Sequence, residues 1–269
     1  MSDTTSCLAA AARDVLLTAD PAEKCARTRD VAAQWRAGTF SGPGLTDAPD
    51  RPARPARPEL LSPSDVPRRR INRGEAGRVA LLHALAHIEL NAVDLAWDII
   101  ARFSGEDLPR DFFDDWVAVA DDEARHFTML AERLSAFGAA YGDLPAHDGL
   151  WDAAIQTRHD LAARLAIVPL VLEARGLDVT PVMVEKLRAA EDHTSADILE
   201  VIYREEVGHV RAGRRWFEYV CAQRGHEPET AWQALVATHF RGDLKPPFNT
   251  DARDAAGMPQ HWYEGLSPA

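Results

Sequence analysis

Two Glu-x-x-His motifs are the residues of this chain whose types and spacing most directly suggest chemistry. They are Glu123-Ala-Arg-His126 and Glu206-Val-Gly-His209. Within a helix, a spacing of three places a carboxylate and an imidazole on one face, nearly one above the other. Such a pair can ligate one metal ion. One copy alone would be weak evidence, because Glu-x-x-His is common on solvent-exposed helices.

Two further glutamates lie in apolar stretches that are expected to be helical. Glu89 is surrounded by leucine, alanine and valine at helical spacing, and Glu173 has Leu170 and Leu177 at similar spacing. A buried carboxylate must be paired, protonated or metal-bound, because burying a bare charge is very costly. For each glutamate the alternative is a surface position at an imperfect point of the apolar stripe.

The pattern Glu … Glu-x-x-His therefore occurs twice, with the glutamates 34 positions apart in the first copy and 33 positions apart in the second. In di-metal four-helix bundles, two helices each supply a Glu and the other two each supply a Glu-x-x-His. Four carboxylates and two imidazoles suit iron or manganese better than structural zinc, which prefers thiolates and closes at four ligands. The predicted ligands of two metal ions are Glu89, Glu123, His126, Glu173, Glu206 and His209.

Three neighbours of the motifs are expected to support the metal ligands without binding metal themselves. Asp122 and Glu205 directly precede the motif glutamates, and a carboxylate often accepts the second N–H of a metal-bound histidine. A solvent-facing charge is the alternative for both residues. Tyr203 lies one turn before Glu206 and is expected to face the metals.

Other residues near the motifs are expected to play no part in ligation. His83 and His87 do not share the helix face of Glu89, which favours a role as hydrogen-bonding partners. Leu130 and Gly213 stand one turn beyond the two motif histidines, which argues against a stored tyrosyl radical at those positions.

Helical periodicity dominates residues 75–224, and strand signals are nearly absent, so the expected fold is an all-α four-helix bundle. The long helices are predicted at about 75–103, 110–137, 150–175 and 194–224. Each carries one of the four glutamates. Pro169 is expected to kink the third helix and Gly176 to end it, with a shorter helix beginning at Thr180-Pro181.

The regions outside the bundle have different compositions. Residues 1–40 are expected to form two short helices, the second of them capped by Asp20-Pro21. Residues 41–74 form a Pro/Arg-rich arm predicted to wrap the bundle as irregular backbone, with its arginines on surface carboxylates. RNA or phospholipid contact is the alternative for the arm. Residues 225–269 are expected to be an irregular C-terminal extension. The apolar residues expected to anchor the arm are Leu60, Leu61, Val66 and Ile71.

Composition limits the classes of protein that this chain could belong to. Its formal net charge of −12 argues against nucleic-acid binding, which needs a basic face. The three cysteines form no CxxC pair, and the first residues lack the basic region of a secretory signal, so a cytoplasmic location is predicted. No apolar run approaches the ~20 residues that cross a bilayer, and no membrane partner is expected.

The six-residue pattern is similar to that of the ferritin-like di-metal carboxylate superfamily. The chain most resembles one branch, the uncharacterised ferritin-like family called domain of unknown function 455. This resemblance implies one elaborated domain over residues 1–269 and a di-metal centre, but implies little about the reaction. It is carried by residues 87–98 (HIELNAVDLAWD), 144–151 (LPAHDGLW), 172–181 (LEARGLDVTP), 203–210 (YREEVGHV) and 245–248 (KPPF).

The preferred functional interpretation is a di-iron or manganese–iron enzyme of the oxygenase or oxidase type. Its expected partners are O₂ or peroxide, a small organic substrate and an electron-donor protein, and a dimer is compatible with the sequence. Trp116, Phe127 and Tyr203 could line a substrate pocket, although such residues more often belong to the core. The alternatives are a ferroxidase, peroxidase or storage-like protein without organic substrate, and a scaffold whose metal only stabilises the bundle.

Overall fold

The computed structural model describes residues 7–66 and 74–266, and in these ranges the protein is all-helical, with no strand. This confirms the predicted all-α class. The chain divides into two compact units, Met1–Trp151 and Asp152–Ala269. Each unit holds one copy of the repeated glutamate and Glu-x-x-His pattern.

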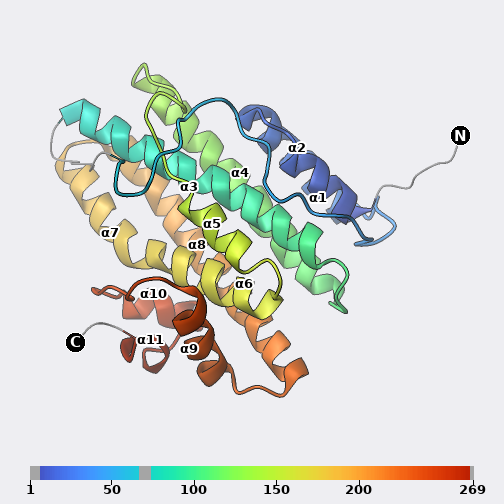
Figure 1. Ribbon diagram of the computed structural model, residues 1–269. Helices are drawn as coiled ribbons and strands as arrows, with labels where there is room; N and C mark the ends of the chain where they lie inside the picture. Colours follow the sequence, from blue (N-terminus) through green and yellow to red (C-terminus); the bar gives the residue numbers. More distant parts are fainter. Residues whose placement is uncertain (1–6, 67–73, 267–269) are drawn as a thin grey trace, which may run out of the picture. The chain divides into compact units, whose positions relative to one another are not determined.

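The first unit is built around two long antiparallel helices, α3 (Gly74–Phe103) and α4 (Arg110–Ala136), which pack along their length (Figure 1). Two shorter helices, α1 (Leu8–Leu16) and α2 (Pro21–Arg36), pack on α3 and α4 respectively. Asp20 caps α2 as predicted, since its side chain accepts a hydrogen bond from the backbone N–H of Glu23 at 2.8 Å.

The described part of the arm, residues 41–66, has irregular backbone, as predicted. One isolated parallel bridge joins Leu60 to Ala146. The predicted apolar anchoring is wrong for Leu60, which is 39% exposed. Leu61 and Val66 are only half-buried, while Ile71 and the arginines at 68–70 and 73 lie outside the described residues.

Buried polar groups hold the arm instead. Asp94 of α3 is fully buried and forms ion pairs with Lys24 of α2 and with Arg54 of the arm. Arg54 also donates to Asn91 Oδ1 at 2.7 Å, and Lys24 Nζ donates to the carbonyl of Ala53 at 3.2 Å. Breaking a buried ion pair typically costs about 3–5 kcal/mol, whereas an exposed pair contributes about 0–1 kcal/mol. The buried carboxylate of Asp94 therefore secures the arm most strongly, and Arg51 of the arm also forms an ion pair with the partly exposed Asp148.

The second unit begins within α5 (Gly149–Gln156) and continues through α6 (Leu161–Ile167), the π-helix η1 (Val168–Glu173) and α7 (Ala174–Ala189). Helix α8 (His193–Arg224) packs against α6, η1 and α7. The predicted disturbance at Pro169 takes the form of the π-helix. Proline lacks an N–H and its ring crowds the carbonyl four residues earlier, so the helix cannot keep its regular hydrogen bonds there.

Two expected helix boundaries in this unit are wrong, because Gly176 and Pro181 both lie inside α7. Pro181 cannot donate to the carbonyl of Leu177 as a regular residue would. The side-chain amide of Asn249 donates to that carbonyl instead, at 3.1 Å. A partner 72 residues away thus allows the helix to continue through the proline.

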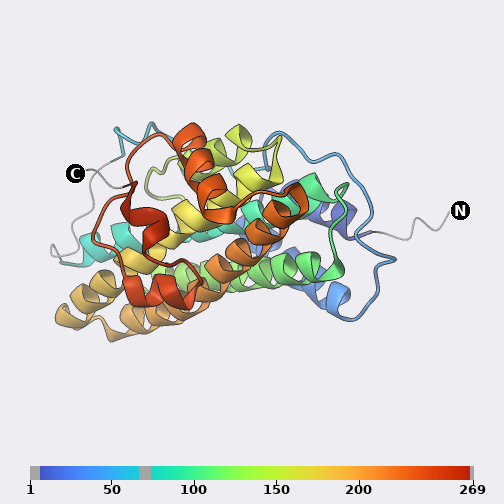
Figure 2. The ribbon, with the colours of Figure 1, turned by 90° about the horizontal axis from the view of Figure 1, so that it is seen from below.

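The C-terminal extension is more regular than predicted. It contains α9 (Pro228–His239) and two very short helices, α10 (Thr250–Ala255) and α11 (His261–Glu264). Helix α10 lies beside α7 and α8 (Figure 2). Helices of four to six residues do not form alone in water, so tertiary contacts must hold them, and composition cannot reveal those contacts.

Among the described residues, α3 is the one helix whose length and apolar composition would allow it to cross a membrane. However, 78% of its most apolar window is buried within the protein. That burial is typical of the core helix of a soluble protein, where the apolar residues face other helices.

Candidate metal centre

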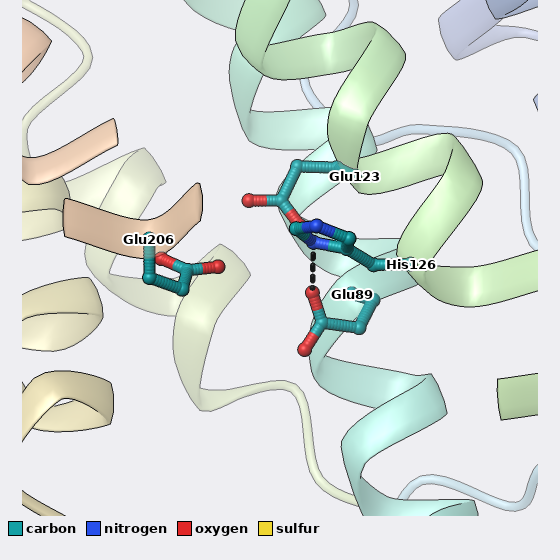
Figure 3. Close-up of side chains that lie close together, drawn as sticks. All are labelled: Glu89, Glu123, His126 and Glu206. Carbon is teal, nitrogen blue, oxygen red and sulfur yellow. Dashed lines mark hydrogen bonds and ion pairs between the residues drawn. The ribbon is translucent and has the colours of Figure 1, made fainter. Parts of the chain in front are cut away.

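The first copy of the repeated pattern forms a buried cluster within the first unit. Glu89 projects from α3, while Glu123 and His126 project from α4, and each offers one ligand atom within 4.8 Å of the others. Figure 3 shows these three side chains directed toward one another. His126 Nδ1 lies 3.3 Å from Glu89 Oε2 and 3.3 Å from Glu123 Oε2.

The two carboxyl groups of this cluster are almost completely removed from water. Burial raises the pKa of Glu89 well above its usual range, and the negative charge of Glu123 raises it further. His126 opposes this shift through its hydrogen bond and its charge, but does not outweigh it. Two neighbouring carboxyl groups in a buried site favour sharing a proton, because both cannot ionise cheaply without a cation.

The donor set fits a transition-metal cation. A buried imidazole and two buried carboxylates supply the nitrogen and oxygen atoms that iron and manganese bind. A divalent cation would replace the proton and offset the repulsion between Glu89 and Glu123 that raises the pKa of Glu89. The cluster is therefore a candidate metal site on both its ligand types and its electrostatics.

The second copy of the pattern lies entirely in the second unit. Glu206 and His209 share one face of α8, with His209 Nδ1 3.6 Å from Glu206 Oε1. His209 is buried, but the Glu206 side chain is 13% exposed, against 1% for Glu123. Glu173 is half-buried and is the last residue of the π-helix η1.

A glycine lets the π-helix approach α8. A Cβ atom added at Gly213 would lie 2.4 Å from Pro169 Cβ and 2.5 Å from Pro169 Cγ, well inside van der Waals contact. Only glycine leaves this space to the proline ring. Gly213 stands one turn beyond His209, so the same contact brings the segment carrying Glu173 against the helix of the second motif.

Comparison with known proteins identifies the family of this chain. The model of the family described as "Protein of unknown function (DUF455)" matches residues 17–264. The chain belongs to this family. A protein of Haemophilus influenzae described as "Uncharacterized protein" is 43% identical over 209 residues, which cover 75% of this chain and 72% of that protein. No solved structure matches the sequence.

The match to the DUF455 family includes the arm, the six predicted ligands and most of the C-terminal extension. It confirms the family that the motif segments indicated. Neither the family description nor the relative's description assigns a metal or a reaction, and the ligand roles of the six residues remain predictions.

The residues expected behind the ligands have mixed surroundings in this DUF455 protein. The carboxylate of Asp122 is 38% exposed and accepts a hydrogen bond from Arg125 at 2.8 Å. Glu205 is half-buried. Tyr203 is also half-buried, and its hydroxyl accepts a hydrogen bond from Asn249 Nδ2 at 2.8 Å. The roles assigned to all three remain predictions.

His83 and His87 hydrogen-bond to the loop after α4, as their positions on the helix suggested. His83 Nε2 accepts from the backbone N–H of Gly142 at 2.9 Å. His87 lies 2.9 Å from the Tyr141 hydroxyl through Nδ1 and 2.9 Å from the His147 carbonyl through Nε2. Burial lowers the pKa of His87 to about 4, so this histidine is neutral at pH 7.

Sequence reasoning missed the residues that set the geometry of the second copy. The sequence distinguishes Gly213 only as a position without tyrosine, and it predicts that Asn249 lies in an irregular C-terminal extension. Asn249 does carry a local signal, because its side chain caps α10 by accepting from the backbone N–H of Ala252 at 3.2 Å. Its contacts with α7 and α8 have no local signal at all.

Proposed function

We propose that this protein is a di-metal carboxylate oxidoreductase that uses O₂ or peroxide to oxidise a small organic substrate. The observation that carries the proposal is the buried cluster of Glu89, Glu123 and His126, in which two carboxyl groups and an imidazole converge. The repetition of the same pattern in the second unit supports two ions rather than one.

The roles follow from the doubled pattern. Glu89, Glu123 and His126 of the first unit would hold one ion, and Glu173, Glu206 and His209 of the second unit would hold the other. The donor types favour an Fe/Fe or Mn/Fe pair. When bound, such a pair supplies the electrons and Lewis acidity for oxygen chemistry, which amino-acid side chains cannot supply.

The surrounding residues contribute exclusion of water and control of protons. Trp116 and Phe127 of α4 are buried, and Glu123 and His126 have no exposed surface. In the metal-free protein, burial and the neighbouring Glu123 raise the pKa of Glu89, which favours the protonated form of its carboxyl group. Loading the site requires that proton to leave, so metal affinity should increase with pH.

We also propose that the protein is cytoplasmic and that it has an electron-donor partner. The largely buried character of α3 and the small number of cysteines support a soluble cytoplasmic protein. An electron-donor protein would be needed to restore the reduced ions after each turnover.

The test combines metal analysis with oxygen consumption. Apoprotein is loaded anaerobically with Fe(II), or with Mn(II) and Fe(II), and bound metal per chain is measured before and after exposure to O₂. We expect two ions per chain and consumption of O₂ that saturates at this loading. One ion per chain would contradict the dinuclear centre. Iron accumulating far beyond two ions would favour the storage alternative, and two bound ions without O₂ consumption would favour the scaffold.

A further inference from the structure

The segment of residues 245–253, here called the clasp, contacts the first turn of α7 directly after Glu173. Arg253 donates to both oxygens of Asp178, at 2.8 Å each, and both side chains are buried. The backbone N–H of Asn249 also donates to Asp178 Oδ1, at 3.0 Å. Asp178 thus joins two points of the clasp to α7.

In a second group of contacts, the donor lies on α7 and the acceptors lie on the clasp. Arg175 Nη1 donates to the carbonyl of Lys245 at 2.6 Å and lies 3.3 Å from that of Pro247. Arg253 Nη2 also donates to the carbonyl of Ala174 at 3.5 Å, so the residues of α7 that bind the clasp begin directly after Glu173. A π-helix is a poor structure in isolation, so contacts just beyond its end are well placed to fix the direction of Glu173.

Asn249 connects this turn with α8. Its Nδ2 atom donates to the Leu177 carbonyl at 3.1 Å and to the Tyr203 hydroxyl at 2.8 Å, while its Oδ1 accepts from Ala252 N. The amide orientation is determined by these partners, because both hydrogens and the oxygen are used. Tyr203 stands one turn before Glu206, so one side chain spans α7 near Glu173 and α8 near Glu206.

We infer that Asn249, through Tyr203, is a positioning residue that sets the second ligand set of the metal centre. The inference rests on the proposed function, because it assigns Glu173, Glu206 and His209 to a metal ion. It adds a role for the C-terminal extension, namely holding the turn after Glu173 at a fixed place relative to the turn before Glu206. The clasp would thereby tune the affinity for one ion without touching it.

The test separates positioning from stability by exploiting Pro181. Asn249→Ser keeps a cap for α10 but removes both amide donations, and Tyr203→Phe removes only the hydroxyl. Pro181→Ala restores a backbone N–H for the Leu177 carbonyl that Asn249→Ser leaves without its donor. Arg211→Ala is the matched control, because Arg211 also joins α8 to the extension but donates to the Ala255 carbonyl, outside the clasp.

Apoproteins are titrated with Co(II), and the visible absorption of each bound ion is followed together with the thermal midpoint. Direct partners of ligands typically change metal affinity about 10–100-fold, and since the clasp acts one step further away we expect a loss of about 3–10-fold for the weaker ion in Asn249→Ser and in Tyr203→Phe. The double variant should lose no more than either single variant. Pro181→Ala combined with Asn249→Ser should recover thermal stability but not affinity.

Three results would overturn the inference. Wild-type affinity for both ions in Asn249→Ser and Tyr203→Phe would show that the clasp does not position the ligands. Recovery of affinity together with stability in the Pro181→Ala combination, or an equal loss in Arg211→Ala, would show a purely structural role. If the wild-type protein itself binds fewer than two ions, the dinuclear proposal and this inference fail together, whereas the first three results leave the dinuclear proposal intact.

Discussion

The two copies of the Glu … Glu-x-x-His pattern have almost the same spacing but different physical settings. In the first, regular α-helices carry all three residues, and Glu89, Glu123 and His126 are buried. In the second, Glu173 ends a π-helix, and both Glu173 and Glu206 are partly accessible. The difference teaches that a repeated ligand pattern does not imply two equivalent metal sites.

The packing of α3 on α4 brings the three residues of the first copy together. The free-energy cost of this arrangement is the removal of two carboxyl groups from water. The second copy depends on special contacts, namely Gly213 against Pro169 and the clasp against α7. We therefore expect the first set to bind its ion with the stronger pH dependence and the second set to be the more sensitive to substitutions outside the ligands.

The largest effect is expected from removing a proposed metal ligand. Glu123→Ala and Glu206→Ala should each lower metal affinity by more than the ~100-fold that loss of an outer partner causes, because each removes a charged donor from one proposed ligand set. Metal analysis after dialysis measures the occupancy. Glu200→Ala, on the exposed face of α8, is the matched control and should retain two ions. Two ions retained by Glu206→Ala would remove that residue from the proposed ligands.

A smaller effect is expected from filling the space at Gly213. Gly213→Ala places a methyl group on Pro169, and overpacking of this kind typically costs about 1–3 kcal/mol. Gly208→Ala is the matched control on the same helix, since nothing lies within 4 Å of its Cβ position. It should stabilise the helix by up to about 1 kcal/mol through helix propensity. Denaturant midpoints of the two apoproteins measure both effects, and two changes of the same sign would contradict the packing argument.

These two regions also show which parts of the molecule a sequence can predict. The ends of α3, α4 and α8 lie within about two residues of their predicted positions. Long amphipathic helices can be predicted in this way because their apolar residues recur with helical periodicity. The convergence of Glu89, Glu123 and His126 follows from the same periodicity, since two packed regular helices bring their inward faces together.

What the sequence could not predict depends on partners distant along the chain. The π-helix at Pro169 requires the space left by Gly213, and the passage of α7 through Pro181 requires the amide of Asn249. The anchoring of the arm requires Lys24 and Asp94, which are 70 residues apart. In each case the local sequence around one residue gives no indication of its distant partner.

The pH dependence of apoprotein stability tests the desolvated character of the first copy. The pKa of Glu89 is near 4.5 in the unfolded chain and well above that in the folded protein, so the folded state holds more protons between the two values. Stability from this group is fully present below pH 4.5 and is lost as pH rises through the folded pKa. Glu89→Gln has similar shape and no proton to lose.

The expected result is that the wild-type apoprotein loses stability relative to Glu89→Gln as the pH rises above about 4.5 and through the raised pKa of the folded state. Titrating groups that do not interact with Glu89 contribute equally to both proteins and cancel in the difference, whereas Glu123 and His126 are coupled to Glu89 and form part of the measured effect. Denaturant unfolding at several pH values measures it. Parallel stability curves would mean that Glu89 has an ordinary pKa and that the first copy is not desolvated.

The smallest effect is expected at Asp122, where the buried first copy meets the surface. Asp122→Asn keeps the shape and removes a charge, and it should retain two ions with an affinity loss of about 10-fold and slower reaction with O₂ if Asp122 supports His126. Arg125→Ala is the matched control, because it removes the surface ion pair, which contributes about 0–1 kcal/mol, and leaves the carboxylate in place. Affinity should then fall in Asp122→Asn alone. Unchanged affinity in both variants would reduce Asp122 to a surface charge, and loss of metal as complete as in Glu206→Ala would make it a ligand and require a new assignment of the first copy.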